Sequence, residues 1–152
     1  MVDRAAVVVE RLTSASDAAV ADINALLPQL KPSWPAITEA TLAEVLSSPT
    51  RVYVALAGGT IVGLTLLVPH RHFGGLRHHV EDVVVDAAHR RRGIARRLLE
   101  AAMADAPAQT VSFDLRSHRT REAAHRLYLG LGFEPSDTTV FRRPAARPDH
   151  DP

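Results

Sequence analysis

The chain has 152 residues, no cysteine and a formal net charge of +1 from 18 basic and 17 acidic side chains. This length suits a single hydrophobic core, and the near-neutral charge argues against a general affinity for nucleic acid or an anionic membrane. The lack of cysteine excludes disulfide bonds, thiolate metal sites and a cysteine nucleophile. No stretch has the apolar run of a signal peptide or a membrane span, which predicts a soluble, cytoplasmic protein.

The N-terminal third predicts a strand followed by two helices. Residues 5–12 are rich in valine, and the segment TSASD after them offers hydroxyl and carboxylate groups that cap helices. In the next helix, apolar side chains recur on one face: Ala18, Ile23, Leu26, Leu27 and Leu30. Pro28 is expected to shorten or bend this helix. After the break at KPSWP, a second short helix is expected over residues 37–48.

The middle of the chain predicts a hairpin, a loop and a strand. Residues 51–57 and 60–68 have strand-like composition and flank Gly58 and Gly59, which supply the positive φ that tight hairpin turns need. Residues 69–79, PHRHFGGLRHH, are polar and glycine-rich, so we expect a loop. The valine-rich segment HVEDVVVD that follows is predicted to be a strand.

The C-terminal half alternates between helix and strand. Ile94, Leu98, Leu99, Ala102 and Met103 recur at helical spacing. Residues 110–116 then alternate as a strand, residues 120–133 form a helix ended by Gly132, and residues 138–143 form a last strand. The tail 144–152 is expected to be disordered, which leaves one domain over residues 1–143.

This order of elements predicts an α+β fold with a mixed sheet. A meander of antiparallel strands precedes a strand–helix–strand crossover, which must place two strands parallel. Ligand sites of open sheets form beyond the carboxyl ends of parallel strands, at a helix N-terminus. The crossover is therefore where we expect a ligand.

The segment DAAHRRRGIARRLL lies at that crossover. At the first turn of a helix, backbone N–H groups have no intrahelical partners and the helix dipole is positive, so an anion can bind there. Gly93 allows a close approach and Ala95 keeps the wall shallow. The arginines of the segment add charge: Arg90, Arg91, Arg92, Arg96 and Arg97. Taken alone, the segment favours a solvated basic helix start over an anion site.

Two motifs together resemble the Gcn5-related N-acetyltransferase (GNAT) superfamily. The first is Arg90-x-x-Gly93-x-Ala95 after a valine-rich strand, and the second is Leu127-Tyr128-x-x-x-Gly132-Phe133 at the end of a later helix. The pair is more specific than either motif alone. The resemblance covers residues 5–143 and implies a twisted, mostly antiparallel mixed sheet with helices on both faces and a splayed pair of parallel strands.

The resemblance implies that acetyl-CoA is the cosubstrate and lies between the two parallel strands. The backbone of Val83, Val84 and Val85 would pair with the pantetheine arm, as an added strand does. The diphosphate would be bound by the turn that comprises Arg90, Arg91, Arg92, Gly93, Ile94, Ala95 and Arg96. One position departs from the family pattern, because Arg121 stands where an asparagine facing the cofactor is common.

The resemblance also implies two catalytic residues, Tyr128 and Glu81. Tyr128 would be the acid that protonates the leaving thiolate, since its reference pKa of about 10 lies above that of a thiol, about 8.5. The alternative is a purely structural core tyrosine. Glu81 would be the general base, the alternatives being a carboxylate that pairs with a nearby arginine or one that binds the amine. Asp82 is assigned to the substrate site. Strand alternation places these two carboxylates on opposite faces, so at most one should face the site.

Trp34 and His79 are the other candidates for the acceptor site. Trp34 would wall the acceptor pocket, the alternative being that it packs the linker between the first two helices. The histidines of residues 69–89 lack the spacing of a metal site, so no metal is expected and solvated side chains are favoured, although His79 could reach the substrate.

The sequence thus predicts an acetyl-CoA-dependent N-acetyltransferase that acts on a primary amine of a small molecule by direct attack. A protein or peptide N-terminus as acceptor and a non-catalytic acyl-CoA sensor are the alternatives. No nucleic-acid or membrane partner is expected, because the charge is balanced and only 5% of the residues are aromatic. The sequence leaves open whether the protein is a homodimer.

Overall fold

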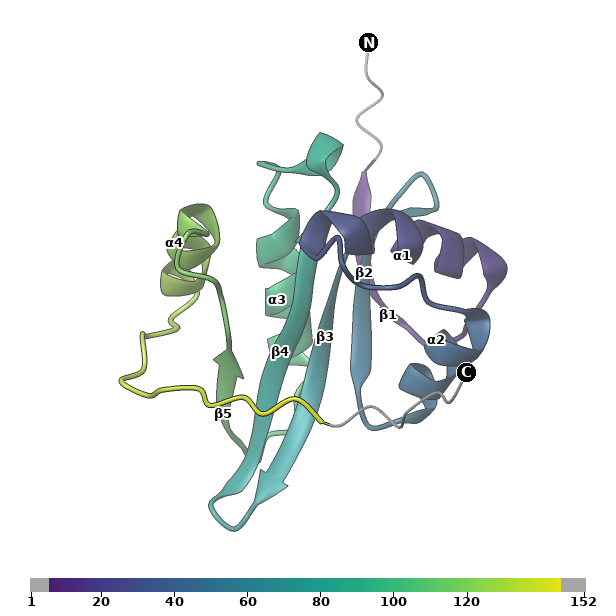
Figure 1. The fold of residues 1–152 in the computed structure, drawn as a ribbon. Coiled ribbons are helices and arrows are strands. Elements are labelled where there is room, and N and C mark those ends of the chain that lie inside the picture. The colour runs from purple at the N-terminus through teal and green to yellow at the C-terminus, as the bar shows by residue number, and fades with distance from the viewer. Residues whose placement is uncertain (1–5, 146–152) are drawn as a thin grey trace.

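The computed structural model describes residues 6–145, which form one five-stranded sheet flanked by helices (Figure 1). In chain order the elements are β1 (Val7–Leu12), α1 (Asp17–Leu30), α2 (Glu39–Ser47), β2 (Arg51–Ala57), β3 (Thr60–His72), β4 (Gly75–Val85), the short 3-10 helix η1 (Ala87–His89), α3 (Ile94–Ala104), β5 (Thr110–Leu115) and α4 (Glu122–Gly130).

The sheet has the mixed topology that the sequence predicts. Its strand order is β1-β2-β3-β4-β5, with antiparallel pairing from β1 to β4 and parallel pairing between β4 and β5. The helix α3 connects the two parallel strands, as a crossover must. The α+β fold class and the position of the crossover are therefore confirmed.

Each face of the sheet carries its own hydrophobic core. On one face, α1 and α2 pack through residues such as Ile23, Leu26 and Leu42 against β2, β3 and β4. On the other face, Leu98 and Leu99 of α3 pack under the sheet together with α4. Among residues 6–145, no helix is long and apolar enough to cross a membrane.

The first two helices begin where the sequence predicts. The side chains of Ser16 and Thr38 accept hydrogen bonds from the first turns of α1 and α2, so both are N-caps. Pro28 does not end α1, which continues to Leu30. The starts of α1 and α2 are thus encoded locally by their capping residues.

The prediction of a loop at residues 69–79 was wrong. These residues extend β3 and β4 into one long hairpin, in register from Pro69 opposite His78 to His72 opposite Gly75. Gly75 has a φ of 118°, which suits the tight turn, and Leu76 and His78 are buried. The backbone pairing of β3 with β4 and the burial of these side chains favour a strand in spite of the polar composition, because strand formation depends strongly on tertiary context.

The last strand predicted, at residues 138–143, was also wrong. In the described part of the chain this segment pairs with no strand. Its apolar residues Val140 and Phe141 are adjacent, so no single face could bury both, and they are 53% and 92% exposed. Of the expected tail 144–152, residues 146–152 lie outside the described residues, as does Ala5 at the start of the first predicted strand.

A polar cluster fastens the end of α3 to β2. The buried hydroxyl of Tyr53 donates to Asp105 Oδ2 at 2.5 Å, and Arg51 Nη1 donates to the Asp105 carbonyl at 2.6 Å. Burial, followed by the hydrogen bond to Asp105, raises the pKa of Tyr53 to about 12. The cluster fixes the crossover helix relative to the sheet that it spans.

Replacing Tyr53 with phenylalanine should therefore destabilise the fold. The variant loses a hydrogen bond to a charged acceptor, so we expect the free energy of unfolding to fall by about 1.5 kcal/mol. Urea denaturation measures this change. Tyr128→Phe is the matched control, and an equal loss in both variants would contradict a specific role for the Tyr53 hydroxyl.

Candidate functional site

The parallel strands β4 and β5 separate at one end and leave an opening. Their pairing stops at Val80 opposite Leu115, although β4 continues to Val85. Within the described chain, residues 81–85 therefore have no partner on the β5 side. A cavity of about 330 Å³ lies in this opening. Its lining includes Trp34, Glu81, Asp82, Val83, Arg116, His118, Arg121 and Tyr128.

A β-bulge in β4 places both carboxylates on one face of the sheet. Leu66 opposes Glu81 and Leu64 opposes Val84, so the single residue Thr65 faces two residues of β4. Asp82 takes a φ of 56°, which breaks the alternation. The prediction that Glu81 and its neighbour point to opposite faces was wrong, because alternation holds only for a regular strand.

The burial of the residues on either side of the bulge also shows that the alternation of side chains along β4 is interrupted there. Val80 and Val83 both pack in the core with α3 and α4, although an odd number of steps separates them. Between them, Glu81 is exposed and Asp82 is partly buried. The hydroxyl of Thr65 donates to the Glu81 carbonyl at 3.1 Å and so satisfies a backbone group at the bulge.

The two carboxylates differ in their surroundings. Burial, and secondly the negative charge of Glu81, raises the pKa of Asp82 above its usual range. Asp82 thus holds a proton more readily than an exposed aspartate does. A raised pKa in a cleft is typical of a group that takes part in proton transfer or binds a cation.

Tyr128 lies on the opposite wall of the same opening. It comes from α4, is 7% exposed, and its ring contacts Phe133 with centroids 6.0 Å apart. Burial raises its pKa, and the positive charge of Arg121 opposes part of that rise. Its hydroxyl has no hydrogen-bond partner in residues 6–145 and remains available to a ligand. The structure therefore brings Tyr128, Glu81 and Asp82 to one cavity.

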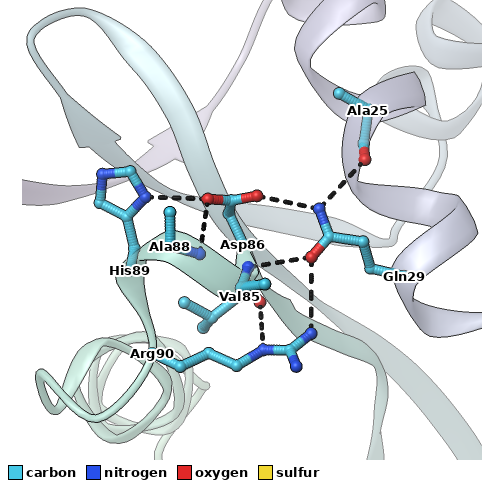
Figure 2. Close-up of polar contacts among 8 residues, drawn as sticks. Ala25, Gln29, Val85, Asp86, Ala88, His89 and Arg90 are labelled. Atoms are coloured by element: carbon cyan, nitrogen blue, oxygen red, sulfur yellow. Dashed lines mark hydrogen bonds and ion pairs between the residues drawn. The ribbon is translucent and has the colours of Figure 1, made fainter.

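The turn after β4 is held in place by a residue that the sequence did not single out. Gln29 of α1 donates to Asp86 Oδ1 at 2.9 Å and accepts from the Ala87 N–H at 2.9 Å (Figure 2). Asp86 Oδ2 in turn accepts from the Ala88 N–H and contacts His89 Nδ1 at 3.0 Å. No sequence signal reveals this link, because Gln29 lies far from the turn along the chain.

The arginines near this turn have different tasks. Arg90 points back to the turn, with its Nε 3.0 Å from the Val85 carbonyl and its Nη2 3.5 Å from Gln29 Oε1 (Figure 2). Arg97 donates to the Val7 carbonyl at 2.8 Å, and Arg96 contacts Glu100 at 3.7 Å. Arg91 and Arg92 are exposed. Two of the arginines thus brace the fold instead of facing an anion.

The start of α3 has the geometry of an anion site. Gly93 precedes the helix with a φ of 72° and provides no capping side chain. The first backbone bond of the helix runs from the Arg97 N–H to the Gly93 carbonyl. Within residues 6–145, the N–H groups of Ile94, Ala95 and Arg96 therefore have no helical partner and can bind an anion.

The two remaining predicted residues have different positions. Trp34 lines the opening and also a second, apolar cavity beside it. His79 does not line either cavity among the described residues, and its Nε2 lies 3.0 Å from His70 Nδ1. Residues 6–145 contain no group of three or more His, Asp or Glu side chains that could hold a metal ion. The structure thus brings Trp34, but not His79, to the site.

Comparison with known proteins agrees with this geometry. Residues 21–133 match the model of the Acetyltransferase (GNAT) family. The chain is 32% identical over 133 residues to a protein named N-alpha-acetyltransferase RimI from Mycobacterium tuberculosis, covering 87% of this chain and 81% of that protein.

Solved structures show the same fold. A Trypanosoma brucei acetyltransferase superposes with a TM-score of 0.75 at 21% identity, covering 91% of this chain and 99% of that one. The structure of AAC(6')-Iy with the bisubstrate analogue CoA-S-monomethyl-acetylneamine superposes with a TM-score of 0.74 at 20% identity, covering 93% and 100%. The predicted fold is confirmed by these likenesses.

The raised pKa of Asp82 predicts that its charge destabilises the folded state. When the pKa of a carboxyl is higher in the folded than in the unfolded chain, the folded protein loses stability as the pH rises from the unfolded pKa through the folded one. We therefore expect Asp82→Asn to raise Tm at pH 7 and to leave it nearly unchanged below the ordinary Asp pKa of about 3.9. Thermal denaturation at the two pH values measures this, with Glu44→Gln, which changes an exposed carboxylate of α2 outside both cavities, as control. A lower Tm for Asp82→Asn at pH 7 would count against the assignment.

Proposed function

This chain belongs to the acetyltransferase (GNAT) family and is an N-acetyltransferase, and we propose that it transfers the acetyl group of acetyl-CoA to a primary amine of a small molecule. One observation carries the proposal. Tyr128 and the carboxylates of Glu81 and Asp82 line a single cavity, and the strand that carries the two carboxylates leads through η1 to a helix start whose N–H groups lack helical partners. In this proposal the cavity supplies a proton donor and a proton acceptor, and the helix start supplies an anion site.

The described residues fit acetyl-CoA in two ways. The N–H groups at the start of α3 and the exposed Arg91 and Arg92 suit a diphosphate. The backbone of Val83, Val84 and Val85 lies along the part of β4 that β5 leaves unpaired, where an extended ligand can add as a strand does. When bound, acetyl-CoA supplies an activated acetyl thioester.

The side chains of the opening suit the proton transfers of amine acetylation. The amine must lose a proton to become a nucleophile, and the departing thiolate must gain one. In this proposal Glu81 or Asp82 accepts the first proton, and burial raises the pKa of Asp82. The hydroxyl of Tyr128 stays protonated well into the alkaline range and can donate the second.

A protein or peptide N-terminus is the second candidate acceptor. It is favoured by the 32% identity to a protein named as an N-alpha-acetyltransferase. The attacking group is a primary amine in both cases, so the roles proposed for Tyr128, Glu81 and Asp82 are the same. The two candidates differ in what surrounds the amine.

Turnover with a panel of amines tests the proposal. Small amines and short peptides are incubated with acetyl-CoA, and the released thiol is measured. We expect turnover by the wild type and its loss in Gly93→Glu, because the new carboxylate would repel an anion at the start of α3 and a side chain at a φ of 72° is strained.

Gly58→Glu is the matched control for this test. Gly58 also has a positive φ, 57°, and open space around its Cα, but it lies in the turn between β2 and β3. The Gly58→Glu substitution imposes similar backbone strain away from the site, so this variant should retain turnover. Binding of acetyl-CoA without turnover of any amine would favour an acyl-CoA sensor instead.

Tyr128→Phe tests the acid. We expect kcat to fall by about a hundredfold, a typical contribution of a general acid, while the KM for acetyl-CoA changes little. Steady-state kinetics across the pH range measures both. Tyr53→Phe removes the other tyrosine hydroxyl of the chain, outside the cavity, and should keep the wild-type kcat. Wild-type turnover of Tyr128→Phe at every pH would rule out the acid role.

A further inference from the structure

A second cavity, of about 240 Å³, lies between the first two helices and the sheet. Its walls come from α1, α2 and β3, with Ile23, Leu27, Leu42, Val45, Leu64 and Leu66 among the lining residues. Of the described residues that line it, only Asp82 is charged. The cavity is therefore an apolar compartment with one carboxylate at its border.

This apolar cavity adjoins the opening between β4 and β5. Trp34 and Asp82 line both compartments, so they form the border between them. A ligand whose amine lies by Asp82 has the polar opening with Tyr128 on one side of it and the apolar cavity on the other. Any group attached close to the amine thus has an apolar surface within reach.

The outer wall of the apolar cavity is fixed by specific contacts. The side chain of Asn24 donates to the Ile37 carbonyl at 2.9 Å and accepts from the Ile37 N–H at 2.8 Å. Lys31 Nζ lies 5.5 Å from the centre of the Trp34 ring. These contacts tie the linker between α1 and α2 to α1, so the cavity is formed before a ligand arrives.

We propose that this apolar cavity binds an aliphatic or aromatic group next to the acceptor's amine, so that the acceptor is a hydrophobic primary amine. The proposal rests on the acetyl transfer proposed above and specifies its substrate class. The cavity is slightly smaller than the roughly 300 Å³ at which small-molecule sites begin, which suits one side chain and not a whole ligand. A polyhydroxylated amino sugar would leave its hydroxyls unpaired there.

Fluorescence tests occupancy without catalysis. Trp34 is the only tryptophan of the chain and lines the cavity, so its emission reports a ligand there. Leucinamide and glycinamide carry the same amine and differ in the side chain. We expect half-saturation by leucinamide at a concentration at least tenfold lower than by glycinamide, since methylene groups in an apolar pocket discriminate by about that factor. Equal titrations would overturn the proposal.

Turnover gives a second, separable test. The value of kcat/KM should rise at least tenfold from glycinamide to leucinamide and should be lowest for glucosamine. Equal values for the two amides would overturn the apolar subsite and leave the proposed acetyl transfer intact. If neither amide turns over, the acetyl transfer to such amines fails, while the fluorescence titration still decides the subsite.

Two variants of α2 test whether the preference for leucinamide over glycinamide arises in the apolar cavity. Val45 lines the cavity, whereas Ala43 is exposed on the same helix. Val45→Phe should fill the space and abolish the preference for leucinamide while glycinamide is still used, which also shows that the variant is folded. Ala43→Phe should keep the wild-type preference, and an unchanged preference in Val45→Phe would contradict the proposal. Should Val45→Phe fail to fold, Val45→Ala should instead shift the preference towards phenylalaninamide.

A further comparison with peptides distinguishes the two possible hydrophobic acceptors, a small-molecule amine and a polypeptide N-terminus. Leu-Gly-Gly and Gly-Gly-Gly are compared in the same assay as the two amides. A leucine preference in both series, with a higher kcat/KM for Leu-Gly-Gly than for leucinamide, indicates a polypeptide N-terminus. Equal values for these two leucine compounds indicate that the side chain alone is recognised. Either result supports the apolar subsite, and the absence of any leucine preference overturns it.

Discussion

The separation of β4 from β5 is the constraint on which the rest of the site depends. The two strands are parallel and pair only as far as Val80 and Leu115, so the last part of β4 keeps an unpaired edge inside the molecule. An unpaired strand edge is normally covered, since its N–H and C=O groups need partners. Here α4 and the linker before α2 flank the opening instead. The fold thus leaves backbone groups of β4 unpaired beside the cavity that Tyr128, Glu81 and Asp82 line.

The bulge at Asp82 works together with this separation. An extra residue in β4 turns two consecutive carboxylates towards the helices α1 and α2, and the positive φ at Asp82 is the local cost of that arrangement. The same bulge places Asp82 at the border of the apolar cavity, so a single irregularity of one strand serves both compartments.

The helix α1 connects the two halves of the site. Its inner face lines the apolar cavity through Ile23 and Leu27, and Gln29 near its end holds the turn that leads into α3. Arg90 completes this link by bonding the Val85 carbonyl and Gln29. The apolar cavity and the turn before α3 therefore share one helix, and Arg90 braces that turn through its side chain.

The sequence by itself determined the order of the elements as far as α4, the parallel crossover and the family, because helix caps, apolar periodicity and the two motifs are local patterns. It also identified Tyr128, Glu81, Asp82 and the turn at Gly93 as candidates. Only the tertiary structure decided the long hairpin at residues 69–79, the common face of the two carboxylates and the role of Gln29. Each of these features depends on which residue of a distant strand or helix lies opposite a given residue. Local composition does not determine that pairing.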